Sequence, residues 1–383
     1  MKIFIITSIP VNPPWDQGDK NLAHSLTRAL PHIQFKILTQ KNTAPQPETN
    51  LITEPFYQTG NPSVAQKAFI YYRLLAHQQV LARSNGAWST DLYHLIYRPY
   101  PVSSTLLRWL PEFHRRATIH TIPATTHPAR LTKGLFFARC NVVLSRYGYC
   151  RLTALGLENV VHIPPGILID EWRMERNQVD YYKRQLGLAD HPVVLFTGHY
   201  GQGMGADMLL RALPQLIRKV PDAIVIFACR YRSPSDLHKE KALKRQVNRL
   251  GLIASVRFYN TFSEMKCLIG ASDLVTLPLS NLNNKLDIPT TLLEFMAMGK
   301  PVVITDIAPM NEIMDGKLGG SKDVGIAVPC GDHNILAESL IQLLLDERLR
   351  ERQGRCGEEV VRTKYNISHV AKRYETLYRE LID

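Results

Sequence analysis

Short runs of β-branched and aromatic residues alternate with longer stretches in which apolar residues recur every three or four positions. The short runs predict buried strands, and the longer stretches predict amphipathic helices. Two series of such strands follow one another along the chain. The first comprises Lys2–Ser8, Phe35–Thr39, Leu92–Tyr97, Ala117–His120 and Asn141–Ser145. The second comprises Val193–Gly198, Ala223–Ala228, Val256–Tyr259, Leu274–Leu277 and Pro301–Thr305.

Helical patterns separate the strands in both series, and the clearest are Asn21–Leu30, Asp207–Val220 and Thr290–Met298. Neighbouring parallel strands need crossover connections, which are usually helices. The chain is therefore predicted to be an α/β protein with two Rossmann-like domains. Ligands of open parallel sheets bind beyond the carboxyl ends of the strands, so a cleft between the domains is the expected site.

The two series are separated by the segment Ile163–Asp170 (IPPGILID), where two prolines and a glycine break regular structure. We place the first domain at residues 1–165 and the second at residues 166–365. A last helical pattern, His369–Leu381, comes after the second sheet is complete.

Composition narrows the class of protein. The chain has 383 residues, of which 45% are hydrophobic and 21% charged, and these values exclude a disordered chain, a collagen-like repeat and a small disulfide scaffold. The net charge of +12 favours an anionic partner: nucleic acid, anionic lipid or a phosphorylated small molecule. No nucleic-acid-binding module is recognisable, so we expect no nucleic-acid partner.

The cysteines and the apolar runs bear on location. Six cysteines form no C-x-x-C pair, and the N-terminal MKIFIITSIP is typical of a strand rather than of a signal peptide. No apolar run approaches the roughly 18 residues of a membrane-spanning helix. We expect free thiols and a cytoplasmic protein, with peripheral attachment to the inner face of a membrane as an open alternative.

The segment Lys285–Thr305 (KLDIPTTLLEFMAMGKPVVIT) carries the strongest candidate site. Thr290 is expected to cap a helix, and Glu294 lies one turn further on. The N–H groups and dipole of a helix N-terminus attract phosphate, and a nearby carboxylate can accept hydrogen bonds from sugar hydroxyls. The alternative is a solvated glutamate behind an ordinary cap, and the residues taken alone favour that alternative.

The stretch LLEFMAMGKPVV resembles the signature of the retaining glycosyltransferases of family 4, which have the GT-B fold and use nucleotide-sugar donors. Other segments resemble this family in the same order over essentially the whole chain. They are Lys2–Leu30, Ala117–Ile122, Val142–Gly166, Val193–Leu213 and Ile253–Ser280.

The resemblance implies a GT-B fold, with two Rossmann-like domains facing across a cleft and a C-terminal helix that crosses back to the first domain. Residues 1–165 with 366–383 would bind the acceptor, and residues 166–365 the nucleotide sugar. The implied reaction moves a hexosyl unit to an acceptor hydroxyl with retention of configuration, in glycan, polysaccharide or glycolipid synthesis. No covalent nucleophile is identifiable, so the leaving phosphate could serve as the base.

The resemblance also assigns roles to residues. Glu294 matches the glutamate that binds the ribose hydroxyls of the donor, and His120 matches a strand-end histidine that contacts the transferred sugar. Gly18 and Gly198 belong to the two glycine loops that approach the donor phosphates. The helix start that receives the diphosphate corresponds to Thr290, Thr291 and Leu292. A turn role for Gly18 and a backbone-satisfied His120 are the alternatives.

The sequence departs from the family where the leaving diphosphate is neutralised. His199 stands in place of the usual arginine, and Met204 in place of the usual lysine. The first glutamate of the family's E-x7-E pair is Leu286, and the adjacent Asp287 could replace it. His120, His199 and Asp287 are therefore the catalytic candidates. The candidate replacement cations are Lys20, Arg230, Arg232, Lys285 and a protonated His199.

Neither a D-x-D sequence nor a metal-ligand spacing of His and Cys occurs. We therefore expect no metal and no cofactor apart from the nucleotide-sugar substrate.

Two segments combine basic and aromatic residues, Ser63–Ser84 and Leu106–Arg116. Such surfaces dock on anionic membrane, which a lipid-linked acceptor would favour. Ordinary domain helices with solvated basic faces are the alternative.

Two other functions stay open beside transfer. A non-catalytic sugar- or nucleotide-binding protein, or a partner subunit, would explain His199, Met204 and Leu286. A sugar-nucleotide epimerase or a phosphorylase would share the fold.

Overall fold

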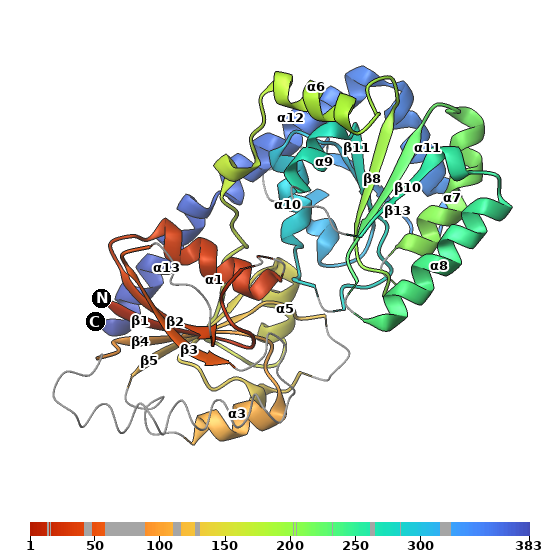
Figure 1. Ribbon diagram of the computed structural model, residues 1–383. Helices are drawn as coiled ribbons and strands as arrows, with labels where there is room; N and C mark the ends of the chain where they lie inside the picture. The colour runs from red at the N-terminus through yellow and green to blue at the C-terminus, as the bar shows by residue number, and fades with distance from the viewer. Residues whose placement is uncertain are drawn as a thin grey trace. The chain divides into compact units, whose positions relative to one another are not determined.

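The structure is a computed structural model of the chain (Figure 1). It describes residues 1–41, 48–57, 89–109, 116–126, 131–260, 265–314 and 323–383, apart from the single positions 14, 16, 202, 204, 232 and 284. The chain divides into two compact units. The first holds Met1–Ile167, Asn283–Thr290 and Tyr365–Asp383, and the second holds Leu168–Leu282 and Thr291–Lys364.

The first unit is built on a parallel sheet whose described strands run in the order β3-β2-β1-β4-β5-β6-β7. These are β1 (Lys2–Thr7), β2 (Gln34–Gln40), β3 (Leu51–Tyr57), β4 (Leu92–Ile96), β5 (Ala117–Ile122), β6 (Cys140–Val143) and β7 (Val160–His162). Ile5 pairs with Ile37 on one side and with His94 on the other. The central strands are buried on both faces, as their continuous β-branched runs predict.

The helices of the first unit include α1 (Gly18–Ala29), α3 (Pro101–Arg108), α5 (Arg146–Thr153) and α13 (Ile367–Ile382). The C-terminal helix α13 joins this unit, as predicted. Its Tyr378 hydroxyl lies 2.7 Å from His94 Nδ1, and its Tyr374 hydroxyl lies 3.1 Å from Thr121 Oγ1. A Cβ on Gly166 would lie 2.9 Å from the backbone of Ile367, so only glycine permits this close approach.

The second unit contains a parallel sheet in the order β10-β9-β8-β11-β12-β13. These strands are β8 (Val193–Gly198), β9 (Ile224–Cys229), β10 (Val256–Tyr259), β11 (Leu274–Leu277), β12 (Val302–Thr305) and β13 (Gly325–Val328). Its helices are α6 (Arg176–Gln185), α7 (Ala206–Lys219), α8 (Pro234–Arg249), α9 (Met265–Ala271), α10 (Thr290–Ala297), α11 (His333–Leu345) and α12 (Glu347–Lys364). The α10 helix starts on the last residue assigned to the first unit.

The strands predicted from the sequence are all present, with ends that shift by up to two residues. Three further strands, β3, β7 and β13, were not predicted. The β3 sequence LITEPFY contains Glu54 and Pro55 and lies at the edge of its sheet, where proline is tolerated because one side of the strand is unpaired. The β7 and β13 strands are edge strands of three and four residues, too short for a clear pattern.

One segment differs from the predicted division at residue 165. Residues 283–290, placed in the second domain from the sequence, belong to the first unit. The physical reason is that Asp287 is fully buried there and accepts hydrogen bonds from Thr125 and Ser145.

Several sequence expectations concern what the described residues lack. Within these residues, no helix is long and apolar enough to span a membrane. The cysteines are free thiols, of which Cys140, Cys229 and Cys267 are buried. The segment Ser63–Ser84 lies outside the described residues, as do residues 110–115 of the second basic segment.

Candidate functional site

The carboxyl edge of the second sheet is the first place to look for a site. The chain leaves β8 toward β9 on one side and returns later to β11 on the other, so the order of strands reverses next to β8. Ligands of open α/β sheets bind at such a point. Gly198 ends β8 with φ of 149°, and a Cβ on it would meet no described atom within 4 Å. The backbone there is open to approach.

The glycine loop after β8 is held by close packing. Gly203 and Gly205 have φ of 75° and 94°, in the left-handed region that favours glycine. The Ser280 N–H donates to the Gly203 carbonyl at 2.8 Å, and a Cβ on Gly205 would lie 2.9 Å from the Pro278 carbonyl oxygen. These glycines therefore let the loop pack on the segment after β11. Met204 lies outside the described residues.

His199 lies inside this loop, where the family has an arginine by resemblance. Its Nδ1 accepts a hydrogen bond from the Gly201 N–H at 3.1 Å. That bond leaves Nε2 to carry the proton of the neutral imidazole. His199 is therefore a neutral side chain in this arrangement, and protonation at Nδ1 would require the bond to break.

Glu294 and Arg230 form the charged part of this edge. Glu294 is half-buried on α10, and burial raises its pKa to about 7, while the Arg230 guanidinium opposes the shift. Arg230 directly follows β9, is exposed, and donates its N–H to the Gly198 carbonyl at 3.0 Å. A carboxyl whose pKa is shifted by burial and that has a cationic partner is a recognised mark of functional sites.

The start of α10 differs slightly from the predicted cap. Thr290 is the first helical residue, not the residue before the helix. Thr291 is partly exposed, and the Leu292 side chain is fully buried in the core. The first N–H groups of a helix have no partner within it, so this turn keeps its capacity for an anion.

Asp287 has no access to a ligand in the first unit. Its side chain is 0% exposed, and its oxygens accept from the Thr125 N–H at 2.7 Å, the Thr125 hydroxyl at 2.6 Å and the Ser145 hydroxyl at 2.6 Å. Burial raises the pKa of Asp287, against these hydrogen bonds and the charge of Arg98. The carboxyl group therefore anchors residues 283–290, and the expectation that it replaces a missing glutamate at a ligand has no geometric support.

Gly18 approaches a neighbour closely, but the neighbour is protein. A Cβ there would lie 2.6 Å from Leu286 Cγ, so Gly18 permits α1 to start against the 283–290 segment. This packing role differs from both the phosphate approach and the simple turn considered above. Among the candidate cations, Lys20 is buried and its Nζ lies 3.2 Å from the Asn12 carbonyl.

The strand-end position predicted for His120 is wrong. His120 lies within β5, which runs on to Ile122, and is 0% exposed. Its Nε2 lies 2.9 Å from the Tyr97 carbonyl, and burial lowers its pKa to about 4. The alternative, a histidine held by backbone, fits the Nε2 bond, whereas Nδ1 is buried without a hydrogen-bond partner among the described residues.

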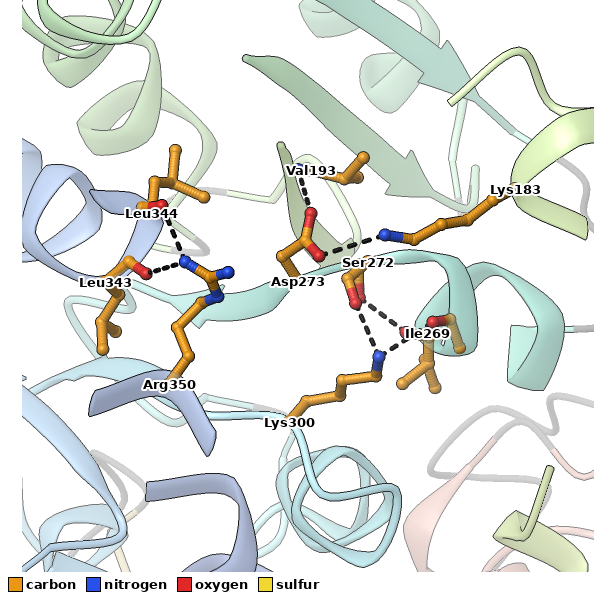
Figure 2. Close-up of polar contacts among 10 residues, drawn as sticks. Lys183, Val193, Ile269, Ser272, Asp273, Lys300, Leu343, Leu344 and Arg350 are labelled. Carbon is orange, nitrogen blue, oxygen red and sulfur yellow. Dashed lines mark hydrogen bonds and ion pairs between the residues drawn. The ribbon is translucent and has the colours of Figure 1, made fainter. Parts of the chain in front are cut away.

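The lysine of the GKPVV signature has a structural role that the sequence did not reveal. Lys300 Nζ donates to the Gly270 carbonyl at 2.8 Å and to the Ser272 carbonyl at 2.7 Å, and Figure 2 shows the second bond. Beside it, Asp273 accepts from the Val193 N–H at 2.7 Å and from Lys183 at 3.1 Å. Val193 begins β8 and Asp273 precedes β11, so this cluster lies at the amino edge, away from Gly198. Figure 2 also shows Arg350 bound to two carbonyls that end α11.

One residue of interest, Tyr231, was missed by the sequence analysis. Tyr231 follows Arg230 in the loop after β9, and its hydroxyl donates to the buried Glu240 at 2.9 Å. The available signal was an aromatic between two arginines directly after a predicted strand.

No metal-ligand cluster is found among the residues described.

Two parallel-sheet units, each with its strand reversal, define the class as a GT-B protein. Two solved structures with low sequence identity support this fold. The Anabaena protein Alr3699/HepE in complex with UDP is 16% identical, covers 100% of both chains and has a TM-score of 0.78. Sucrose-phosphate synthase from Thermosynechococcus elongatus is 18% identical, covers 99% of this chain and 98% of that one, and has a TM-score of 0.79.

Sequence comparison finds a family match largely within the second unit and several relatives. Residues 191–346 match the family described as glycosyl transferases group 1. A phosphatidyl-myo-inositol mannosyltransferase of Mycobacterium leprae is 30% identical over 232 residues, which are 60% of this chain and 55% of that protein. An alpha-D-kanosaminyltransferase of Streptomyces kanamyceticus is 25% identical over 52% of this chain and 48% of that protein. The chain thus spans about half the length of these relatives.

Proposed function

We propose that this protein transfers a hexosyl unit from a nucleoside diphosphate sugar to an acceptor hydroxyl. The observation that carries the proposal is the placement of Gly198, Arg230 and Glu294 at one edge of the second unit. All three lie within the part that matches glycosyl transferases group 1. The relatives support the substrate class, because a similar fold holds UDP and two relatives are named as sugar transferases.

The side chains divide the work on the donor. The Glu294 carboxylate accepts hydrogen bonds from the ribose hydroxyls. The first N–H groups of α10, at Thr290, Thr291 and Leu292, face the diphosphate. The bond from the anomeric carbon to phosphate breaks, the bond to the acceptor oxygen forms on the same face, and the acceptor proton passes to the leaving phosphate. Because the phosphate departs and the acceptor attacks on the same face, the anomeric configuration is retained.

Arg230 is the cation that we assign to the leaving diphosphate. Negative charge develops there as the glycosidic bond breaks, and a preorganised cation stabilises it. Lys20 is buried, Lys285 belongs to the first unit, and Arg232 lies outside the described residues. Arg230 is exposed, beside the Gly198 carbonyl, and within electrostatic reach of Glu294.

The acceptor that we propose is a glycan or a lipid-linked sugar, bound with the first unit, at the cytoplasmic face of a membrane. The segment Leu106–Arg116 is described only in part. In that part, Trp109 is 77% exposed and directly follows Arg108. A large exposed aromatic beside a cation suits the interface of an anionic membrane. The relative from Mycobacterium leprae is named a phosphatidyl-myo-inositol mannosyltransferase, which supports a glycolipid acceptor. No metal is included in the mechanism, since protein cations and helix N–H groups can meet the charge.

A non-catalytic nucleotide-binding protein is the second candidate. His199 is neutral in its observed hydrogen bond, and Leu286 is buried where the family has a glutamate by resemblance. Both changes remove charge from the expected catalytic set.

A turnover assay separates the two. Each of several nucleoside diphosphate sugars is incubated with the protein and release of the nucleoside diphosphate is measured, with simple sugars and lipid-linked sugars as acceptors. Release that depends on acceptor supports transfer. Nucleotide-induced thermal stabilisation without release would leave only the binding protein, and neither effect would reject both.

A further inference from the structure

A network of polar side chains fixes one exposed tyrosine at the same edge of the second unit. Glu240, on α8, is 2% exposed and accepts the Tyr231 hydroxyl at 2.9 Å and the Lys244 ammonium at 2.6 Å. Asn260, directly after β10, donates its amide N–H to the same Tyr231 oxygen. The phenol therefore both donates and accepts a hydrogen bond, which fixes the position of its hydroxyl.

The Tyr231 ring lies beside that of a second tyrosine, Tyr200, and the two differ in exposure. Tyr200 is 1% exposed, whereas Tyr231 is 40% exposed, and their ring centroids are 6.4 Å apart. Burial together with the Glu240 carboxylate raises the pKa of Tyr231 to about 12, so its hydroxyl stays protonated and keeps donating. Tyr231 thus has a fixed polar end and an accessible ring.

Packing alone does not account for this arrangement. Burial alone would raise the pKa of Glu240. The hydrogen bonds from Lys244 and Tyr231 and the charge of Lys244 outweigh burial, so the net pKa is lowered and the carboxylate stays ionised. A buried carboxylate that is ionised and partnered holds its hydrogen-bond donors firmly. The ring so held is left exposed, although covering it would bury more apolar surface. Rigid aromatic groups that are fixed before binding lose little entropy when a ligand stacks on them.

The position of Tyr231 indicates the ligand. It follows Arg230, whose N–H bonds the Gly198 carbonyl at the end of β8. An aromatic ring next to an arginine, both at the carboxyl edge of a parallel sheet, suits a ligand that joins a planar ring to phosphate. We propose that the nucleobase of the sugar donor stacks on the Tyr231 ring, with Glu240 and Asn260 as positioning residues. This inference rests on the proposed function and names the surface that reads the base.

The test compares Tyr231→Leu with wild type by calorimetric titration of UDP, GDP, ADP and, separately, inorganic pyrophosphate. We expect Tyr231→Leu to weaken the nucleoside diphosphate that wild type binds by about 5- to 100-fold, the range for loss of one base–aromatic stack. Pyrophosphate, which has no base, should bind both proteins equally. Tyr231→Phe keeps the ring and should lose less than Tyr231→Leu.

Tyr181→Leu is the matched control, because Tyr181 is an exposed tyrosine on α6 of the same unit. It should bind every probe as wild type does. If wild type and Tyr231→Leu bound the nucleoside diphosphate equally, the stacking of the base on Tyr231 would be refuted, and the proposed function would still stand. An equal loss for pyrophosphate would also refute the stacking, since the effect would not depend on the base. If wild type bound no nucleoside diphosphate, this inference and the proposed function would both fall.

Discussion

The polar residues of the two units are used differently. In the first unit, His94, His120 and Asp287 are all 0% exposed, and each holds hydrogen bonds within the fold. In the second unit, Arg230 is exposed, and Glu294 is half-buried with a pKa raised to about 7. Two of the catalytic candidates from the sequence, His120 and Asp287, therefore form hydrogen bonds that stabilise the fold of the first unit. Arg230 and Glu294, to which we assign roles in donor binding, lie at the carboxyl edge of the second sheet.

This difference has a physical basis. A buried polar group is stabilised by its partners and loses them if it turns to a ligand. A carboxyl whose ionisation is disfavoured, as for Glu294, reduces stability in exchange for readiness to bind. Changes in the first unit should therefore act mainly on stability, and changes at the second edge mainly on binding and turnover.

The largest effect is expected for Arg230→Ala. Loss of a preorganised group that stabilises charge in the transition state lowers turnover by about 100- to 1000-fold. Arg230→Lys should recover part of the rate, because it keeps the charge without the planar fork. The measurement is initial-rate kinetics on the nucleotide sugar that wild type uses. Arg218→Ala, at an exposed arginine in the last turn of α7, is the control and should be unchanged. Full activity in Arg230→Ala would remove the arginine from the mechanism.

Asp287→Ala should act on stability. It deletes the acceptor of three buried hydrogen bonds and leaves the Thr125 and Ser145 hydroxyls without it. We expect the free energy of unfolding to fall by about 3 kcal/mol, measured by urea titration. Nucleotide affinity of the folded variant should match that of wild type. If Asp287→Ala kept its stability but lost nucleotide binding, the proposed difference between the two units would be contradicted.

Glu294→Gln should raise the stability of the ligand-free protein at high pH. The pKa of Glu294 is raised from 4.5 to about 7, so the folded state binds more protons than the unfolded state between these values. Stability contributed by the carboxyl group therefore falls as pH rises through this window. The variant cannot ionise, and should exceed wild type by about 1 to 3 kcal/mol at pH 8 and by nothing near pH 4. Chemical denaturation at both pH values measures this, and a difference that does not depend on pH would contradict the raised pKa.

The smallest effect concerns acid unfolding of the first unit. Burial, and then the charge of His120, lowers the pKa of His94 to about 3, where Tyr378, Thr121 and Tyr374 also surround the ring. A histidine with a depressed pKa contributes stability that is present above its usual pKa of 6.5 and is lost as pH falls toward 3. His94→Gln cannot take up this proton. Once any loss of stability at pH 7 is allowed for, its acid-unfolding midpoint should lie about half a pH unit below that of wild type. Circular dichroism against pH measures the midpoint, and an unchanged or higher value would argue against the buried neutral imidazole.

Much of the fold was predictable because it depends on local patterns. The β-branched runs of β1, β8 and β9 and the proline and glycine near residue 166 specify buried strands and a break between units. The edge strands β3 and β13 were missed, because their residues are only partly buried and their pattern is weak. The α13 helix was located by its pattern, but its attachment to the first unit rested on family resemblance.

The site was predictable only in part. Glu294 and the start of α10 follow a signature with a local sequence pattern. The burial of Asp287 depends on Thr125 and Ser145, more than a hundred positions away in the chain, so no local pattern reveals it. The fixed ring of Tyr231 likewise depends on contacts among α8, the loop after β9 and the end of β10. Long-range packing separates residues that support the fold from residues that are available to a ligand.

The central claim is that the edge formed by Gly198, Arg230 and Glu294 binds a nucleoside diphosphate. The most direct measurement is calorimetric titration of UDP, GDP and ADP into wild type and Glu294→Ala at pH 8, where the carboxylate is ionised. We expect at least one nucleotide to bind wild type, and Glu294→Ala to weaken it by about 10- to 100-fold, as for loss of hydrogen bonds to a charged group. Equal affinity of the two proteins for every nucleotide, or no binding by wild type, would contradict the account.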